Sequence, residues 1–142
     1  MTNVGKPRSK KTTDPRSLVT EAHVQQTVTE FLELDGWRSI RTDPVSDRAR
    51  GKGFGELGMP DYLYIRYAVY RETGLPASLD DPPTARLWNQ LLWIEYKRPG
   101  AKPTAHQIAW HKAERARGAL VLVVDDIDAF RKWYAESGLK RR

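Results

Sequence analysis

Two short motifs combine residue types that bind a divalent metal ion. Asp61 follows Pro60, and Glu95 stands two residues before Lys97; each pattern occurs once in the chain. On a strand, the side chains of Glu95 and Lys97 project to one face and that of Tyr96 to the other. If the strand after Asp61 lies beside that of Glu95, two carboxylates and the Tyr96 carbonyl offer hard oxygen ligands. Mg²⁺ and Mn²⁺ take such ligands together with several waters.

Lys97 supplies a positive charge to the predicted metal site. A compact ammonium could hold or deprotonate an activated water, or stabilise the charge that grows on a phosphate. A lysine with the ordinary pKa of about 10.4 is charged at neutral pH, which favours the electrostatic role. The other interpretation is that Glu95 and Lys97 simply solvate an exposed strand end.

A glycine-rich segment precedes Asp61 and superficially matches a nucleotide-binding fingerprint. Gly53-Phe-Gly55-Glu-Leu-Gly58 fits G-x-G-x-x-G. That fingerprint must follow a strand and open a helix, whereas this segment runs into Pro60 and a predicted strand. We therefore expect no nucleotide cofactor. Residues 43–60 are predicted to form a long loop, whose glycines would let the backbone approach a phosphate chain.

Hydrophobic periodicity predicts an α/β domain with a mixed sheet and the order helix, strand, strand, strand, helix, strand, helix. The predicted elements are a helix from Thr20 to a stop at Gly36, strands at 37–42, 61–67 and 91–97, a helix from Thr104 to Gly118, a buried parallel strand at 119–124 and a helix at 126–137. Thr104 and Gln107 form a capping box. Residues 72–89 are rich in Pro and Asp and are expected to be irregular.

Composition limits the classes of partner and compartment. The 142 residues predict one domain, with a formal net charge of +6 that favours a polyanionic partner. There is no cysteine, so disulfides and thiol chemistry are excluded and a reduced, cytoplasmic setting is expected. The longest apolar run, 119–124, is too short for a membrane span.

The positive charge is concentrated at the two ends of the chain. Residues 1–16 and residues 131–142 each hold five basic side chains and one acidic, whereas residues 17–130 hold 14 basic and 16 acidic. We expect a mobile basic arm at 1–16, one domain at 17–138 and a basic tail at 139–142.

Gly58-Met-Pro-Asp61, Glu95-Tyr-Lys97 and Gln107 in the next helix together resemble the virus-type replication-repair nuclease (VRR-NUC) branch of the PD-(D/E)xK nucleases. Glu21 matches an acid of that family's first helix. The resemblance covers about residues 20–128 and implies a restriction-endonuclease-like core with the order α-β-β-β-α-β. It further implies an Mg²⁺- or Mn²⁺-dependent endonuclease of DNA repair, acting as a homodimer on branched DNA such as Holliday junctions, and a bacterial or phage origin.

The resemblance also implies a role for each matching residue. Asp61 and Glu95 would hold the ion with the Tyr96 carbonyl, and Lys97 would position the attacking water. Glu21 would be a supporting or second-metal carboxylate, and Gln107 would orient water or phosphate.

Two of these residues have simpler explanations from the sequence itself. Glu21 is also a favourable acid in the first turn of a helix. Gln107 also completes the capping box, and we expect that one side chain cannot fully serve both purposes.

Basic residues near the predicted site could bind phosphates, although a solvated surface explains them equally well. They are Arg41, Arg48, Arg50 and Lys52 before the glycines, and Arg98, Lys102, Lys112, Arg115 and Arg117 around the second predicted helix. The histidines form no predicted site, because His106 and His111 are five residues apart rather than four.

One segment departs from the family pattern. The 33 residues between Asp61 and Glu95 exceed the usual short hairpin, so residues 67–89 are interpreted as an insertion that could contact substrate or a second subunit. Two other functions remain open. They are a non-catalytic nucleic-acid-binding module, in which the carboxylates are structural, and a protein-interaction domain.

Overall fold

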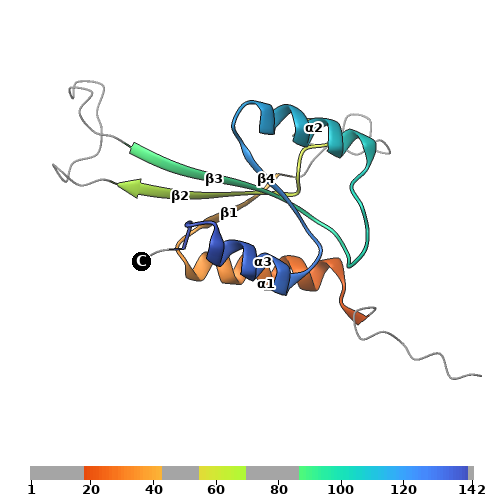
Figure 1. Ribbon diagram of the computed structural model, residues 1–142, viewed down its shortest axis with the longest axis horizontal. Helices are drawn as coiled ribbons and strands as arrows, with labels where there is room; N and C mark the ends of the chain where they lie inside the picture. Colours follow the sequence, from red (N-terminus) through yellow and green to blue (C-terminus); the bar gives the residue numbers. More distant parts are fainter. Residues whose placement is uncertain (1–17, 43–54, 70–86, 141–142) are drawn as a thin grey trace, which may run out of the picture.

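The structure is a computed structural model that describes residues 18–42, 55–69 and 87–140. It contains the elements α1 (Glu21–Leu34), β1 (Arg38–Arg41), β2 (Tyr62–Val69), β3 (Leu87–Tyr96), α2 (Ala105–Ala116), β4 (Leu120–Val124) and α3 (Ile127–Glu136), as Figure 1 shows. The predicted order of helices and strands is confirmed. None of the helices in the described ranges is long and apolar enough to cross a membrane.

The strands form one mixed sheet with the order β1-β2-β3-β4. β2 pairs antiparallel with both β1 and β3, while β3 and β4 run parallel. The predicted α/β class and the predicted parallel strand are therefore confirmed. Val121 and Val124 of β4 are buried, Leu122 and Val123 are half-buried and Leu120 is 37% exposed, so the predicted burial of this strand is confirmed only in part.

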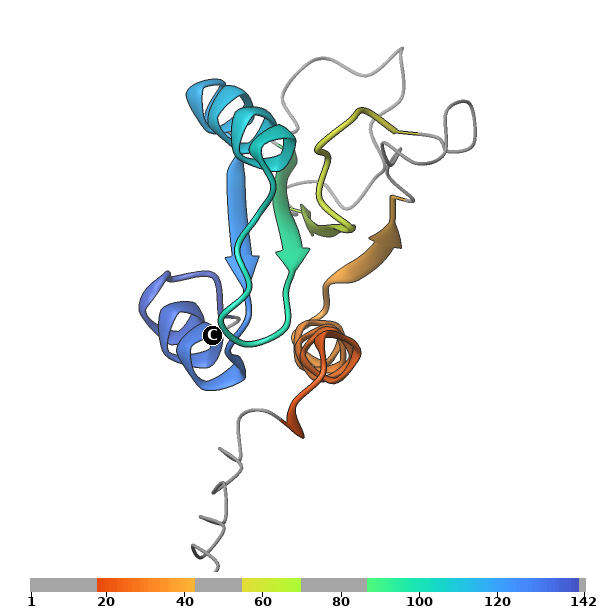
Figure 2. The same cartoon turned by 90° about the vertical axis from the view of Figure 1, so that its right-hand side faces the viewer.

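Helices cover both faces of the sheet. α2 lies on one face, and α1 and α3 lie together on the other (Figures 1 and 2). The main core is between the sheet and the α1/α3 layer, where Tyr64, Leu92 and Tyr96 are fully buried. Alternation along β3 then places Glu95 on the opposite face, beneath α2.

Tyr96 is anchored in the core by a chain of hydroxyl groups. Its hydroxyl and that of Tyr64 lie 2.7 Å apart, and the Tyr64 hydroxyl lies 2.7 Å from that of Thr29 on α1. Burial raises the pKa of Tyr64 to about 12, so its hydroxyl stays protonated. Because Tyr96 is fixed toward α1, its neighbours Glu95 and Lys97 are fixed toward α2.

At the opposite end of the sheet a buried charge joins both helices of the α1/α3 layer. Arg66 of β2, which is 6% exposed, pairs with Asp35 at the end of α1 at 2.8 Å. The hydroxyl of Tyr134 on α3 donates to the same carboxylate and accepts from the indole N–H of Trp37 at 2.7 Å. A buried charge needs such partners, so this network ties α1 and α3 to β2.

The β2–β3 ribbon is longer than the sequence predicts. β2 continues to Val69 and β3 begins at Leu87, so the predicted irregular stretch 72–89 is wrong at its last three residues. Asn89 and Gln90 have weak strand propensity, but they lie opposite Tyr67 and Arg66 of β2, and this pairing supports them.

Several predicted segments lie outside the described residues. They are the basic arm at 1–16, the part of the glycine loop at 43–54, the middle of the predicted insertion at 70–86 and the last two residues of the basic tail.

The loop before β2 packs directly against the first turn of α2. Gly58 is buried and has a φ of 86°, and a Cβ atom there would lie 2.3 Å from the backbone oxygen of His106. Both the backbone conformation and the close approach require glycine. The glycine of the Gly58-Met-Pro-Asp61 motif thereby lets α2 lie beside Asp61.

We expect Gly58→Ala to destabilise the fold more than Gly118→Ala. Gly118 also has a positive φ, of 93°, but open space surrounds its Cβ position, so that substitution costs only the strained backbone, about 1 kcal/mol. At Gly58 the overlap of the new methyl group with α2 should lower the free energy of unfolding by about 1–3 kcal/mol more, the usual cost of overpacking. Urea denaturation of both variants measures the difference. Equal losses would contradict the close packing of this loop on α2.

Candidate active site

Asp61 and Glu95 come together at one end of the β2–β3 pair. Tyr62, the first residue of β2, lies opposite Ile94 of β3, so Asp61 lies level with the end of β3. The backbone N–H of Tyr96 donates to Asp61 Oδ2 at 3.4 Å. The expectation that the strand after Asp61 lies beside the strand of Glu95 is therefore confirmed.

Glu95 is a buried carboxylate with its two oxygens in different environments. Its side chain is 1% exposed, and Oε1 lies 2.6 Å from the Lys97 ammonium and 2.5 Å from Nε2 of Gln107. Oε2 is buried and has no hydrogen-bond partner among the described residues. Desolvation, with the nearby charges of Asp61 and Glu21, raises the pKa of Glu95 to about 7 against the opposing effect of Lys97.

Gln107 serves the helix and the carboxylate at the same time. Its Oε1 accepts the backbone N–H of Thr104 at 2.9 Å, which completes the predicted capping box. Its Nε2 donates to Glu95. The two ends of the carboxamide thus point to different protein partners, and the expectation that one side chain cannot serve both the cap and a water or phosphate stays a prediction. The cap therefore aims the amide group at Glu95.

Glu21 contributes negative charge to the site from α1. It is the first residue of that helix and is exposed, with Thr20 as the N-cap. Its charge contributes to raising the pKa of both Asp61 and Glu95. The three predicted carboxylates are therefore close enough for their charges to interact, although Glu21 belongs to a helix and Asp61 and Glu95 to the end of the sheet.

The pKa of Asp61 is raised as well, and burial is the largest cause. The N–H of Tyr96 and the positive charges of Lys97 and Arg41 act in the opposite direction. Two desolvated carboxylates with raised pKa values repel each other unless a cation or a proton compensates them.

The donor set fits a hard divalent ion. Mg²⁺ is commonly held by one or two carboxylates and keeps several waters. Within the described ranges, no group of three or more His, Cys, Asp or Glu side chains is arranged to hold a metal ion, so the candidate set is the pair of Asp61 and Glu95. Oε2 of Glu95, which has no partner within the described ranges, is the buried oxygen that such an ion would satisfy. A role for the Tyr96 carbonyl remains a prediction.

The predicted phosphate-binding residues that the structure describes are all exposed: Arg41, Arg98, Lys102, Lys112, Arg115 and Arg117. The last two also make bonds within the fold. Arg115 donates twice to the backbone oxygen of Val121, at 3.1 and 2.6 Å, and Arg117 pairs with Glu114. Arg48, Arg50 and Lys52 lie outside the described residues.

Sequence reasoning missed two side chains on the inner side of α2, of which Trp110 fixes the helix over the sheet. The indole N–H of Trp110 donates to Glu56 at 2.8 Å, and its ring contacts that of Trp93 edge-on at 5.1 Å. His111 is 2% exposed, next to Trp110 on the inner side of α2. Their spacing of three and four residues from Gln107 is the signal that could have placed them on the same helix face.

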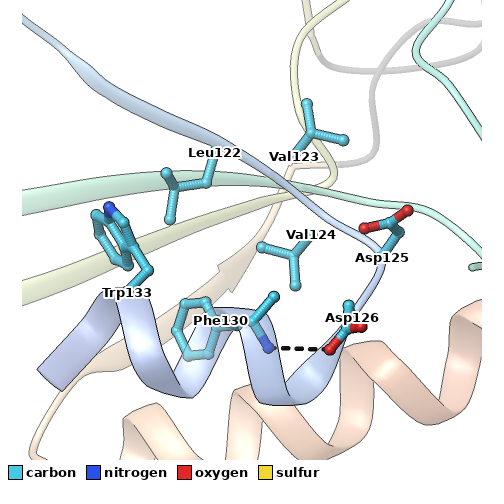
Figure 3. A pocket seen from close by; sticks show the side chains of 8 residues that line it. Leu122, Val123, Val124, Asp125, Asp126, Phe130 and Trp133 are labelled. Atoms are coloured by element: carbon cyan, nitrogen blue, oxygen red, sulfur yellow. Dashed lines mark hydrogen bonds between the residues drawn. The ribbon is translucent and has the colours of Figure 1, made fainter. Parts of the chain in front are cut away.

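A separate pocket lies between β4 and α3, on the face of the sheet opposite to α2 (Figure 3). Its walls are largely apolar, with Leu122, Phe130 and Trp133 among the lining residues. Asp126 at its edge caps α3 by accepting the backbone N–H of Ala129 at 2.9 Å. Its acidic side chain thus serves the helix, and the pocket is distinct from the candidate active site.

No family model, curated protein or solved structure matches this chain.

We expect Glu95→Gln to stabilise the metal-free protein at high pH. Glu95 ionises near pH 4.5 in the unfolded chain and near pH 7 in the fold, so the folded state holds a proton that the unfolded state has lost. The stability of the wild type should therefore fall as the pH rises through this range. Glutamine keeps an oxygen for Lys97 and Gln107 but never ionises, which should make the variant more stable by about 3 kcal/mol at pH 8.

Urea denaturation at pH 4, 6 and 8 without divalent ions measures this difference. It should be small at pH 4, where Glu95 is protonated in both states, and largest at pH 8. A difference independent of pH would contradict the raised pKa of Glu95.

Proposed function

We propose that this chain is a divalent-metal-dependent endonuclease that hydrolyses DNA phosphodiester bonds, with a restriction-endonuclease-like core of the VRR-NUC type. The observation that carries the proposal is the pair of Asp61 and Glu95 at the end of two adjacent strands, with the Lys97 ammonium 2.6 Å from Glu95. The resemblance of the motifs to that family supports the same conclusion.

The proposed cofactor is Mg²⁺ or Mn²⁺, held by Asp61 and Glu95 with Glu21 as a supporting carboxylate. Bound there, the ion would neutralise phosphate charge and activate water for in-line attack. Oε2 of Glu95 is buried and has no partner in the part of the chain that the structure describes, which suits a ligand atom. Oε1 is already held by Lys97 and Gln107, so the carboxylate is fixed in orientation before any ion arrives.

The other residues have separate tasks in this proposal. Lys97 carries a positive charge beside the carboxylates, where it would stabilise the charge that develops on the phosphate during cleavage. Gln107 keeps Glu95 aligned through the cap of α2. The exposed side chains of Arg41, Arg98, Lys102 and Lys112 would neutralise flanking phosphates.

The proposed substrate is branched DNA, cut by a homodimer. A domain of this size with one metal centre makes one incision, whereas a symmetric junction needs two, and a two-fold dimer supplies both. The basic residues at the two ends of the chain would add affinity for the DNA without taking part in the chemistry.

We expect the purified protein to cut branched DNA with Mg²⁺ or Mn²⁺ and not with EDTA. Asp61→Ala and Glu95→Ala should each lower the cleavage rate at saturating DNA by at least about a hundredfold, because each removes a metal ligand. Asp128→Ala is the matched control, since this carboxylate is 94% exposed on α3 and should leave the rate unchanged.

Fluorescence anisotropy with the same DNA separates the competing functions. A protein that binds the DNA with a steep salt dependence but shows no turnover with Mn²⁺ is a binding module. Cleavage that survives both alanine substitutions would remove the proposed site, and absence of DNA affinity at low salt would favour a protein-interaction domain.

A further inference from the structure

α2 lies over the sheet on the side opposite to α1 and α3 (Figure 2), and three of its polar side chains share one stripe. Gln107, His111 and Arg115 are spaced by four residues and therefore lie along one stripe of the helix. Gln107 donates to Glu95, and Arg115 donates to the backbone oxygen of Val121. His111 lies between these two anchored residues.

His111 has an unused hydrogen-bonding atom in a buried position. Its side chain is 2% exposed, and Nε2 is buried without a partner among the described residues. Burial, together with the positive charges of Arg115 on the same helix and Lys97 on the sheet, lowers the pKa of this imidazole. The ring is therefore neutral at neutral pH, and one of its nitrogens is a lone-pair acceptor. Such an atom is costly to bury unless a donor uses it.

Lys97 is the candidate donor, because Arg115, the other cation whose charge acts on His111, already donates from two nitrogens to Val121. The Lys97 side chain is 16% exposed, and its positive charge contributes to lowering the pKa of His111. An ammonium has three N–H donors, whereas among the described residues Lys97 has one side-chain partner, Glu95 Oε1. A divalent cation on Asp61 and Glu95 would compete for that carboxylate and repel the ammonium.

We propose that His111 is a positioning residue for Lys97, whose ammonium donates to His111 Nε2 when Asp61 and Glu95 bind a divalent cation. This inference rests on the proposed metal site and adds a residue that the family resemblance does not supply. In this arrangement the ring proton is on Nδ1. Lys97 then stays beside the carboxylates, charged and ready to face the phosphate, instead of turning away to solvent.

The direct test is nuclear magnetic resonance of the full chain labelled with ¹⁵N-histidine, with and without saturating Mg²⁺. In the metal-free protein, Nε2 of His111 should give the signal of an unprotonated nitrogen. Mg²⁺ should shift this signal in the direction of an accepted hydrogen bond in the wild type, but not in Lys97→Met. A protonated Nε2, or the same response in both proteins, would overturn the proposal.

Two substitutions test the same contact by kinetics. His111→Leu removes the acceptor and should lower kcat about tenfold or more, with KM and the calorimetric Mg²⁺ affinity unchanged within about twofold. His111→Gln restores an oxygen acceptor and should recover most of kcat. Thermal unfolding confirms that both variants fold.

The outcomes separate the two proposals. If the wild type cuts DNA and His111→Leu has a normal kcat, or His111→Gln loses as much as His111→Leu, only the role of His111 is overturned. If the folded wild type neither binds Mg²⁺ nor cuts DNA, the proposed function fails and the role of His111 fails with it.

Discussion

The burial of the Glu95 carboxylate beneath α2 is the constraint on which the candidate site depends. A carboxylate that is 1% exposed has lost its contact with water, and the protein must replace it. Lys97 and Gln107 bind one carboxylate oxygen, while the other has no partner among the described residues. The compensation is incomplete, because the pKa of Glu95 is still raised to about 7. A protein keeps such a group at a cost to stability, and functional sites are where such costs concentrate.

Structural features on both faces of the sheet hold this carboxylate in place. On the α1/α3 side, Tyr96 is locked into the core through its contact with the Tyr64 hydroxyl, so Glu95 is directed toward α2. On the α2 side, the capping box fixes Gln107, and Gly58 allows the helix to approach the loop before Asp61. Local rules of strand alternation and helix capping thus determine the geometry of the site.

Much of this arrangement could be predicted from the sequence because it follows from local periodicity. The order of elements, the capping box and the common face of Glu95 and Lys97 all depend on neighbours within a few residues. The start of β3 at Leu87 could not be predicted, since Asn89 and Gln90 are held there by pairing with β2. The dual role of Gln107 and the burial of His111 were also missed, because both depend on how α2 sits over the sheet.

The central claim is that Asp61 and Glu95 jointly bind a divalent ion, and a crystal soaked in Mn²⁺ tests it most directly. Diffraction data collected at the manganese edge would locate the ion by its anomalous signal. The account predicts one peak within about 2.0–2.3 Å of oxygens of both carboxylates, with Oε2 of Glu95 among the ligands. A peak elsewhere, or none at this pair at saturating Mn²⁺, would contradict it.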